Sequence, residues 1–376
     1  MFKKAISGVA ALALSALAVG LGAQSANALP VTTSWTDAGL EEMFSVNGNI
    51  TWSADGLGIN SGQTGNIQVN RPAASSVIAA FLMVSTNGVA TAPTDVKVNN
   101  AAVTFTHKAT ETTSGFEFTN YLADVTSNVK SLLDASGPGV FNIPIDNGAN
   151  QVGDPYITGD ALVVVFNTPS APLASIVLNF GTSDVAGDTF TLAYPSLTLP
   201  QTADLQMSIG DAYSYGEDQN SVITVNGQTL TNHAGHFDDN STFVAGQPEP
   251  WAAEDPALIT VGGVGDSLAN PNTSAPWSTT ADDELYSLSP FVAVGDTAIS
   301  VNTVNASNDD NLFMALFYLK EVTVTGSLPA SSLGTITTPL ADPVLADTGF
   351  DGSIPALAAL VALLGGAAAV RRRFTV

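Results

Sequence analysis

Two stretches of the chain decide its fold class: residues 77–84, which read VIAAFLMV, and residues 161–166, which read ALVVVF. Each is a short, continuous apolar run without glycine or proline, and such runs are typical of strands buried on both faces. Other runs alternate apolar and polar positions, as Ile299, Val301 and Thr303 do, which favours half-buried strands. The sequence therefore predicts an all-β protein.

Local signals add a hairpin and a helix to this pattern. Asn226-Gly227 separates two strand-like segments, and this dipeptide favours the tight two-residue turn of a β-hairpin. A short helix that ends near Gly137 is predicted from the helical spacing of Leu122, Val125, Val129 and Leu132.

Near residues 197–202 the segment Leu-Thr-Leu-Pro follows one strand-like run and precedes another, which suggests a domain boundary. The resulting segments, residues 29–198 and 199–325, have the size of ordinary β-sandwich domains, so we expect two tandem, jelly-roll-like β-sandwiches. Residues 326–344 are rich in Gly, Ser, Thr, Pro and Leu with few charges, which is typical of a stalk.

Composition excludes several functional classes. The 376 residues include 34 Asp and Glu but only 10 Lys and Arg, and a net charge of −24 is incompatible with binding nucleic-acid phosphates. The absence of cysteine excludes disulfides, thiolate metal sites and a cysteine nucleophile. Stability must therefore come from the packed core.

The first 28 residues have the features of a signal peptide. Lys3 and Lys4 precede an apolar stretch over residues 5–21, and Ala26-Asn27-Ala28 presents the small residues that signal peptidase recognises. We expect cleavage after Ala28, so that the exported chain begins at Leu29.

The last 32 residues, 345–376, combine a pentapeptide, an apolar stretch and a basic tail. The stretch over residues 354–370 is long enough for a membrane helix at the lower limit, and Arg371, Arg372 and Arg373 favour a cytoplasmic end. The pentapeptide consists of Leu345, Ala346, Asp347, Thr348 and Gly349.

This arrangement resembles the cell-wall sorting signal of sortase substrates in Gram-positive bacteria. Ala346 stands where the usual motif has proline, as in a variant used by one class of sortase in high-GC Gram-positive bacteria. The resemblance implies that a sortase cysteine attacks the Thr348 carbonyl and that a peptidoglycan precursor resolves the thioester. The expected location is then extracellular and covalently attached to the wall, with the sorting helix as the only contact with the membrane.

Removing both ends leaves a strongly acidic exported chain. Cleavage after Ala28 and after Thr348 removes five of the ten basic residues and one of the 34 acidic residues, so residues 29–348 carry five basic and 33 acidic side chains. No cofactor is required by any motif, but loop carboxylates suit calcium, which prefers oxygen ligands. Candidate ligands are Asp238, Asp239, Asp282, Asp283, Glu284, Asp309 and Asp310.

Six Gly-Asp pairs also stand out, and their ordinary interpretation is turns, since glycine accepts positive φ and aspartate bonds nearby amides. They are Gly153-Asp154, Gly159-Asp160, Gly187-Asp188, Gly210-Asp211, Gly265-Asp266 and Gly295-Asp296.

The body resembles an uncharacterised all-β family of bacterial surface proteins that often carry adhesin-like repeats and a wall anchor. The resemblance depends on residues 121–126 (YLADVT), 159–166 (GDALVVVF), 282–286 (DDELY) and 308–313 (NDDNLF). It implies tandem β-sandwiches on an anchored stalk and carries over no catalytic residues.

Two functional classes remain open. The favoured interpretation is a non-catalytic adhesin or structural wall module whose partner is an unknown protein or glycan. The alternative is a wall-anchored carbohydrate-active enzyme, because paired carboxylates can lie far apart in sequence. Other weak signals are His233 and His236 as half of a zinc site, and a sugar-stacking platform made from Trp35, Trp52, Trp251 and Trp277.

Overall fold

The structure is a computed structural model that describes the central part of the chain in segments. The described residues are 33–36, 39–58, 64–88, 92–111, 118–150, 156–184, 187–194, 204–213, 221–234, 259–266, 268, 284–305, 310–322 and 326–329. Within them, the regular elements other than strands are the helix α1 (Thr126–Ala135) and the 3-10 turn η1 (Ser289–Phe291). The prediction of an all-β protein is confirmed.

Eleven strands form one long sheet, in which all pairings are antiparallel except that of β1 with β7. In spatial order the sheet contains β1 (Thr33–Thr36), β7 (His107–Thr110), β8 (Phe118–Asp124), β4 (Ser76–Asn87), β10 (Ile157–Asn167), β2 (Glu41–Gly58), β11 (Leu173–Phe180), β19 (Asp310–Lys320), β13 (Leu205–Tyr213) and β16 (Ile259–Val261), and β17 (Leu285–Ser287) also pairs with β13.

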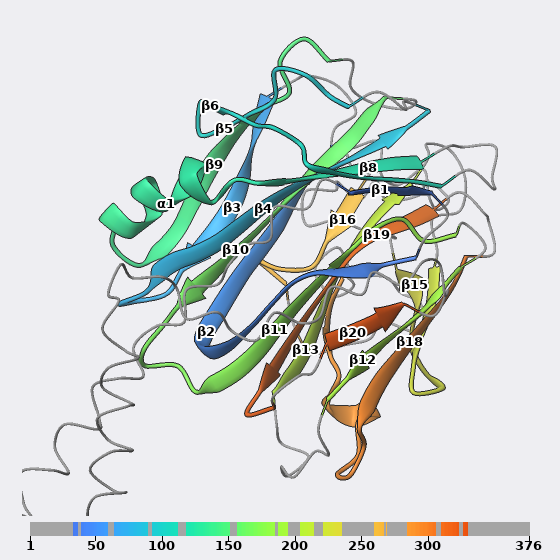
Figure 1. Cartoon of the computed structure of the whole chain (residues 1–376). Coiled ribbons are helices and arrows are strands. Elements are labelled where there is room, and N and C mark those ends of the chain that lie inside the picture. The colour runs from blue at the N-terminus through green and yellow to red at the C-terminus, as the bar shows by residue number, and fades with distance from the viewer. Residues whose placement is uncertain are drawn as a thin grey trace, which may run out of the picture. The chain divides into compact units, whose positions relative to one another are not determined.

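Strand β2 divides this sheet into two wings. Its C-terminal half, from Ile50 to Gly58, pairs with β10, whereas its N-terminal half, from Glu41 to Asn49, pairs with β11. We call β1, β7, β8, β4 and β10, together with the C-terminal half of β2, the first wing. The second wing contains the N-terminal half of β2 with β11, β19, β13, β16 and β17 (Figure 1).

Two smaller sheets complete the described strands. The five-stranded sheet has the order β15 (Gln228–Ala234), β14 (Ser221–Val225), β18 (Ala298–Asn305), β12 (Thr189–Ala193) and β20 (Gly326–Pro329). The four-stranded sheet has the order β3 (Thr64–Arg71), β9 (Gly139–Asp146), β5 (Lys97–Val98) and β6 (Ala101–Ala102).

Three hydrophobic cores bind these sheets into layers. On β10, Ala161 and Val163 belong to one core while Leu162 and Val164 belong to another, because successive side chains point to opposite faces. The first core lies between the two wings, where the Phe44 and Phe81 rings meet with centroids 5.2 Å apart. The second joins the first wing to the four-stranded sheet and α1, and the third joins the second wing to the five-stranded sheet.

Several local predictions are confirmed. Every residue of the stretches 77–84 and 161–166 is buried except Ile78, which is partly buried. The Asn226-Gly227 turn joins β14 to β15, with φ of 50° and 76°, values that a type I′ turn requires. The helix exists but begins only at Thr126, so Leu122 lies in β8 and Leu133, not the exposed Leu132, faces the core.

Strands on either side of the expected domain boundary are paired with one another. The strands β11 and β12 precede residue 198, yet β11 pairs with β19 and β12 pairs with β18. A division at residue 198 would therefore separate strands that pair with each other in one sheet. The domain limits themselves stay a prediction.

Two glycines allow the wings to approach each other closely. A Cβ on Gly159 of β10 would lie 2.6 Å from the Ile259 side chain and 2.7 Å from the Leu57 carbonyl oxygen. A Cβ on Gly56 would lie 2.8 Å from Val261. Since real Cβ atoms do not approach other atoms so closely, β16 can rest on the first wing only where side chains are absent.

We expect Gly159→Ala to lower the free energy of unfolding by about 1–3 kcal/mol, the usual cost of overpacking a filled core. Gly137→Ala is the matched control, because no atom lies within 4 Å of the added Cβ. Thermal and urea unfolding of the two variants measure the difference. Equal stability of both variants would show that the wings are not in close contact at Gly159.

Candidate functional site

Most residues predicted to carry function lie outside the described part of the chain. These are the signal-peptidase site at Ala26 and Ala28, the sorting residues 345–349, the membrane stretch 354–370 and five predicted calcium ligands, Asp238, Asp239, Asp282, Asp283 and Asp309. Of Asp310 and His233 only the backbone is described, in β19 and β15. Within the described residues, no helix is long and apolar enough to cross a membrane.

The backbone of β13 lies close to two of the predicted calcium ligands. Ile209 N donates to the Glu284 carbonyl oxygen at 3.0 Å, and Tyr213 is opposite Asp310 on the neighbouring β19. Glu284 is fully buried, and its Oε2 accepts a hydrogen bond from the Tyr286 hydroxyl at 2.9 Å. Asp211, also fully buried, lies on β13 between these two positions.

Four of the six Gly-Asp pairs divide into two kinds. Gly265-Asp266 and Gly295-Asp296 are turns as predicted: both glycines have φ near +100°, and each aspartate accepts from the amide three residues earlier. Gly159-Asp160 and Gly210-Asp211 instead lie inside strands and are completely buried. There the glycine permits close packing of the sheets, and the aspartate is a buried polar group that the turn interpretation missed.

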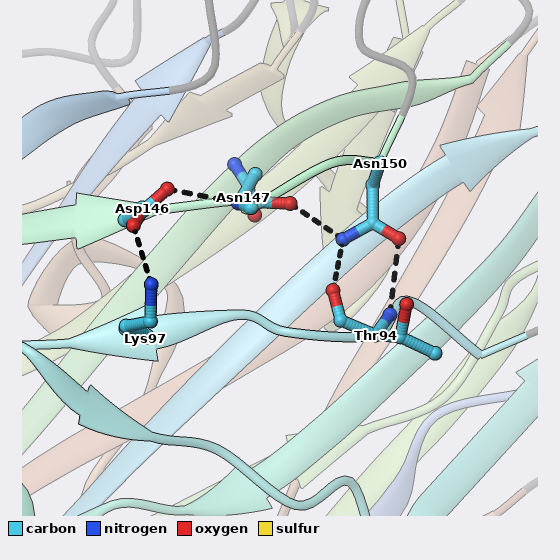
Figure 2. A network of polar contacts seen from close by, with 6 residues as sticks. Thr94, Lys97, Asp146, Asn147 and Asn150 are labelled. Carbon is cyan, nitrogen blue, oxygen red and sulfur yellow. Dashed lines mark hydrogen bonds and ion pairs between the residues drawn. The ribbon is translucent and has the colours of Figure 1, made fainter.

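The most completely described polar site is a turn after β9, which we call the turn network and define by Thr94, Lys97, Asp146, Asn147 and Asn150 (Figure 2). The Asn150 side chain binds the backbone of Thr94 twice: its Nδ2 donates to the Thr94 carbonyl oxygen, and its Oδ1 accepts from Thr94 N at 3.0 Å. The same Nδ2 donates to the carbonyl oxygen of Asn147 at 2.5 Å. The turn is thereby fixed to the segment that leads into β5.

An ion pair closes the other side of this network. Lys97 Nζ donates to Asp146 Oδ2 at 3.0 Å, while Asp146 Oδ1 accepts from Gly148 N at 2.9 Å. Both interactions hold the pKa of Asp146 below its usual range, with the hydrogen bond from Lys97 as the largest cause. Because both side chains are more than a third exposed, this pair contributes little to stability.

Beneath the turn lies a buried carboxyl group. Asn147 Nδ2 donates to Asp160 Oδ2 at 2.7 Å, and neither residue has any exposed surface. Desolvation raises the pKa of Asp160 to about 7, although the hydrogen bond from Asn147 acts in the opposite direction. The second oxygens of both side chains, Asp160 Oδ1 and Asn147 Oδ1, are buried and have no hydrogen-bond partner among the described atoms.

A second buried polar group links the two wings. Asn120 on β8 donates through Nδ2 to the Gly181 carbonyl oxygen at 2.8 Å and to Asn311 Oδ1 on β19 at 2.7 Å. Asn311 in turn donates to Thr182 Oγ1 at 2.6 Å and to the Ser183 carbonyl oxygen at 2.8 Å. We interpret these linked hydrogen bonds as interactions that fix the relative positions of strands far apart in the sequence.

The described residues supply few groups suited to catalysis. Burial lowers the pKa of His107 to about 4, so its ring is neutral at physiological pH. Its Nδ1 lies 2.9 Å from Thr106 Oγ1, but no described carboxylate orients the ring as in a hydrolase triad. Within the same segments no three His, Asp or Glu side chains are grouped closely enough to hold a metal.

Of the weaker signals, Trp52 packs against the core between the wings and is only partly exposed. The side chains of Trp35, Trp251 and Trp277 lie outside the described part of the structure.

Comparison with known proteins gives no relative for this arrangement: no family model, no curated protein and no solved structure matches the chain.

Proposed function

We propose that the protein is exported, anchored covalently to the cell wall and exposed on the cell surface, where it acts as a non-catalytic adhesin or structural module. The observation that carries this proposal is the order of signals along the chain. Residues 1–28 have the residue pattern of a cleavable export signal, and residues 345–376 combine a pentapeptide, an apolar stretch and three arginines. Sortase and a peptidoglycan precursor are the partners that this order implies.

We further propose that the body consists of two β-sandwiches. The first would combine the first wing with the four-stranded sheet, and the second would combine the second wing with the five-stranded sheet. What supports this is that each wing shares a buried core with the smaller sheet that packs on it. In this proposal β11 and β12 belong to the second sandwich although they precede residue 198.

The alternative, a wall-anchored carbohydrate-active enzyme, needs two carboxyl groups about 5–10 Å apart at a concave surface. The one acid of the turn network, Asp146, already accepts hydrogen bonds from Lys97 and from the backbone amide of Gly148. A stalked all-β body suits display of a binding surface to a protein or glycan. Release of reducing sugar from a glycan by the exported chain would favour the enzyme instead.

Anchoring is tested by fractionating cells after digestion of the wall. We expect the protein in the wall fraction, with Thr348 linked to a peptidoglycan fragment detectable by mass spectrometry. Deletion of residues 345–349 should move the protein to the membrane or the medium, whereas deletion of an equal length of stalk, residues 331–335, should not. An unprocessed C-terminus found in the membrane of the unaltered strain would contradict the proposal.

We also propose calcium binding by the acidic loops, with Asp238, Asp239, Asp282, Asp283, Asp309 and Asp310 as ligands. Its support is the placement of Glu284 and Asp310 on either side of β13 and the scarcity of basic residues that could neutralise them. A site occupied at a hundred times its dissociation constant stabilises the fold by about 2.7 kcal/mol.

Millimolar calcium should therefore raise the melting temperature more than magnesium does at equal ionic strength. Equal shifts from calcium, magnesium and sodium chloride would indicate simple screening of the acidic surface and no specific site.

A further inference from the structure

If Asp160 is ionised, its contact with Asn147 leaves two buried acceptor oxygens without a donor. One hydrogen bond, from Asn147 Nδ2 to Asp160 Oδ2 at 2.7 Å, is formed. That leaves Asn147 Oδ1 and Asp160 Oδ1, two acceptors that are buried without a donor. Exchanging the oxygen and nitrogen of the amide does not help, because an oxygen would then face the carboxylate.

A single proton would satisfy both atoms. A protonated carboxyl group carries one O–H donor, and a carboxamide offers one donor and one acceptor on the same edge. If the proton is on Asp160 Oδ1, it can be donated to Asn147 Oδ1, parallel to the hydrogen bond already present. The two side chains then form a closed pair with two hydrogen bonds and no net charge.

We infer that Asp160 is protonated in the folded protein and that its pairing with Asn147 is a pH-sensitive latch for the turn network. Asn147 begins the turn, and its carbonyl oxygen is the acceptor for Asn150, which in turn binds Thr94 (Figure 2). The proton on β10 is therefore linked through two asparagines to the segment that leads into β5.

Among the residues that the structure describes, no unpaired cation is placed to take the position of this proton. Asp160 faces the four-stranded sheet, and the charged groups near it on the packed elements are Asp55 on β2, Asp146 and Lys97 on the four-stranded sheet, and Asp95 before β5. Lys97 is paired with Asp146, and Asp55 already accepts a hydrogen bond from Gln68 N at 2.5 Å. On the neighbouring strand β4, the residue paired with Asp160 is Val84, which is apolar.

The direction of the pH effect follows from burial. Desolvation raises the folded-state pKa of Asp160 from 3.8 to about 7. A raised pKa contributes stability that is complete below the unfolded-state value and is lost as the pH rises through the folded-state value. Above about pH 7 the carboxylate ionises, two acceptors face each other, and the turn should detach from Thr94.

The test compares the exported chain with its Asp160→Asn and Asp95→Asn variants. Asn at position 160 keeps the shape and the two hydrogen bonds of a protonated acid but cannot titrate. The unfolding equilibrium constant of the unaltered chain should rise up to tenfold more per pH unit than that of D160N between about pH 4 and 7. The control D95N removes an exposed charge beside the turn and should keep the full pH dependence.

Infrared spectra test whether Asp160 carries a proton or is ionised. Amide exchange tests whether its protonation controls the turn network. Infrared difference spectra with labelled aspartate should show a buried protonated carboxyl group at pH 5 that D160N lacks. Amide exchange over residues 92–98 and 146–150, corrected for intrinsic rates, should increase above pH 7 only where Asp160 is present.

An identical pH dependence of stability in the unaltered chain and D160N would overturn the inference. So would an Asp160 that is ionised at pH 5 in a protein whose stability depends on added calcium. If D160N does not fold, the onset of faster amide exchange over residues 92–98 and 146–150 above pH 7 in the unaltered chain decides the question, since an infrared band alone could also come from the equally buried Asp211.

Discussion

The pairing of β2 with β10 along one half and with β11 along the other is the constraint on which the rest of the structure depends. Eighteen residues, Glu41–Gly58, give their backbone hydrogen bonds to two wings that then face each other across a shared core. Strands that pass from one sheet to another in this way form the corners of packed sheets. Without the long β2, the faces of Phe44 and Phe81 would not meet.

Side chains of β2 also organise the neighbouring four-stranded sheet. On its edge strand β3, the backbone amide of Gln68 donates a hydrogen bond to the Asp55 carboxylate, and that of Asn70 donates to Ser53 Oγ. These two amides at the unpaired edge of β3 are therefore satisfied by side chains of β2. An unsatisfied edge would be a site of aggregation. The same strand therefore supplies main-chain pairing to two wings and edge protection to a third layer.

The all-β class, the hairpin at Asn226-Gly227 and the short helix could be predicted from the sequence because each depends on neighbours in the chain. The pairing of β11 with β19 could not, since Leu178 and Leu316 meet across more than a hundred residues and nothing local marks them as partners. Nor did residues 41–58 look like a strand, because Glu, Asn and Gly interrupt the alternation.

The buried acids were missed for a related reason. A Gly-Asp dipeptide has the statistics of a turn, and only the packing of the wings explains why Gly159 and Asp160 lie inside a strand. For the sorting signal the sequence remains the whole basis of the proposal.

Because basic residues are scarce, lysine and arginine can satisfy few of the buried polar groups. Lys97, Lys130 and Lys320 each pair with an aspartate near the surface, and Arg71 donates to the Ser75 and Ser136 carbonyl oxygens. Buried carboxyl groups must then be satisfied by neutral donors or by protons, as in the contact of Asp160 with Asn147.

Native-state hydrogen exchange at increasing urea concentration tests the central claim, that one shared strand makes the layers a single cooperative unit. Amides of β10 and β19 lie on different wings, and the account predicts that both converge on the same free energy of opening and the same denaturant dependence. Exchange of β19 through a separate, lower-energy opening while β10 and β2 remain protected would contradict it.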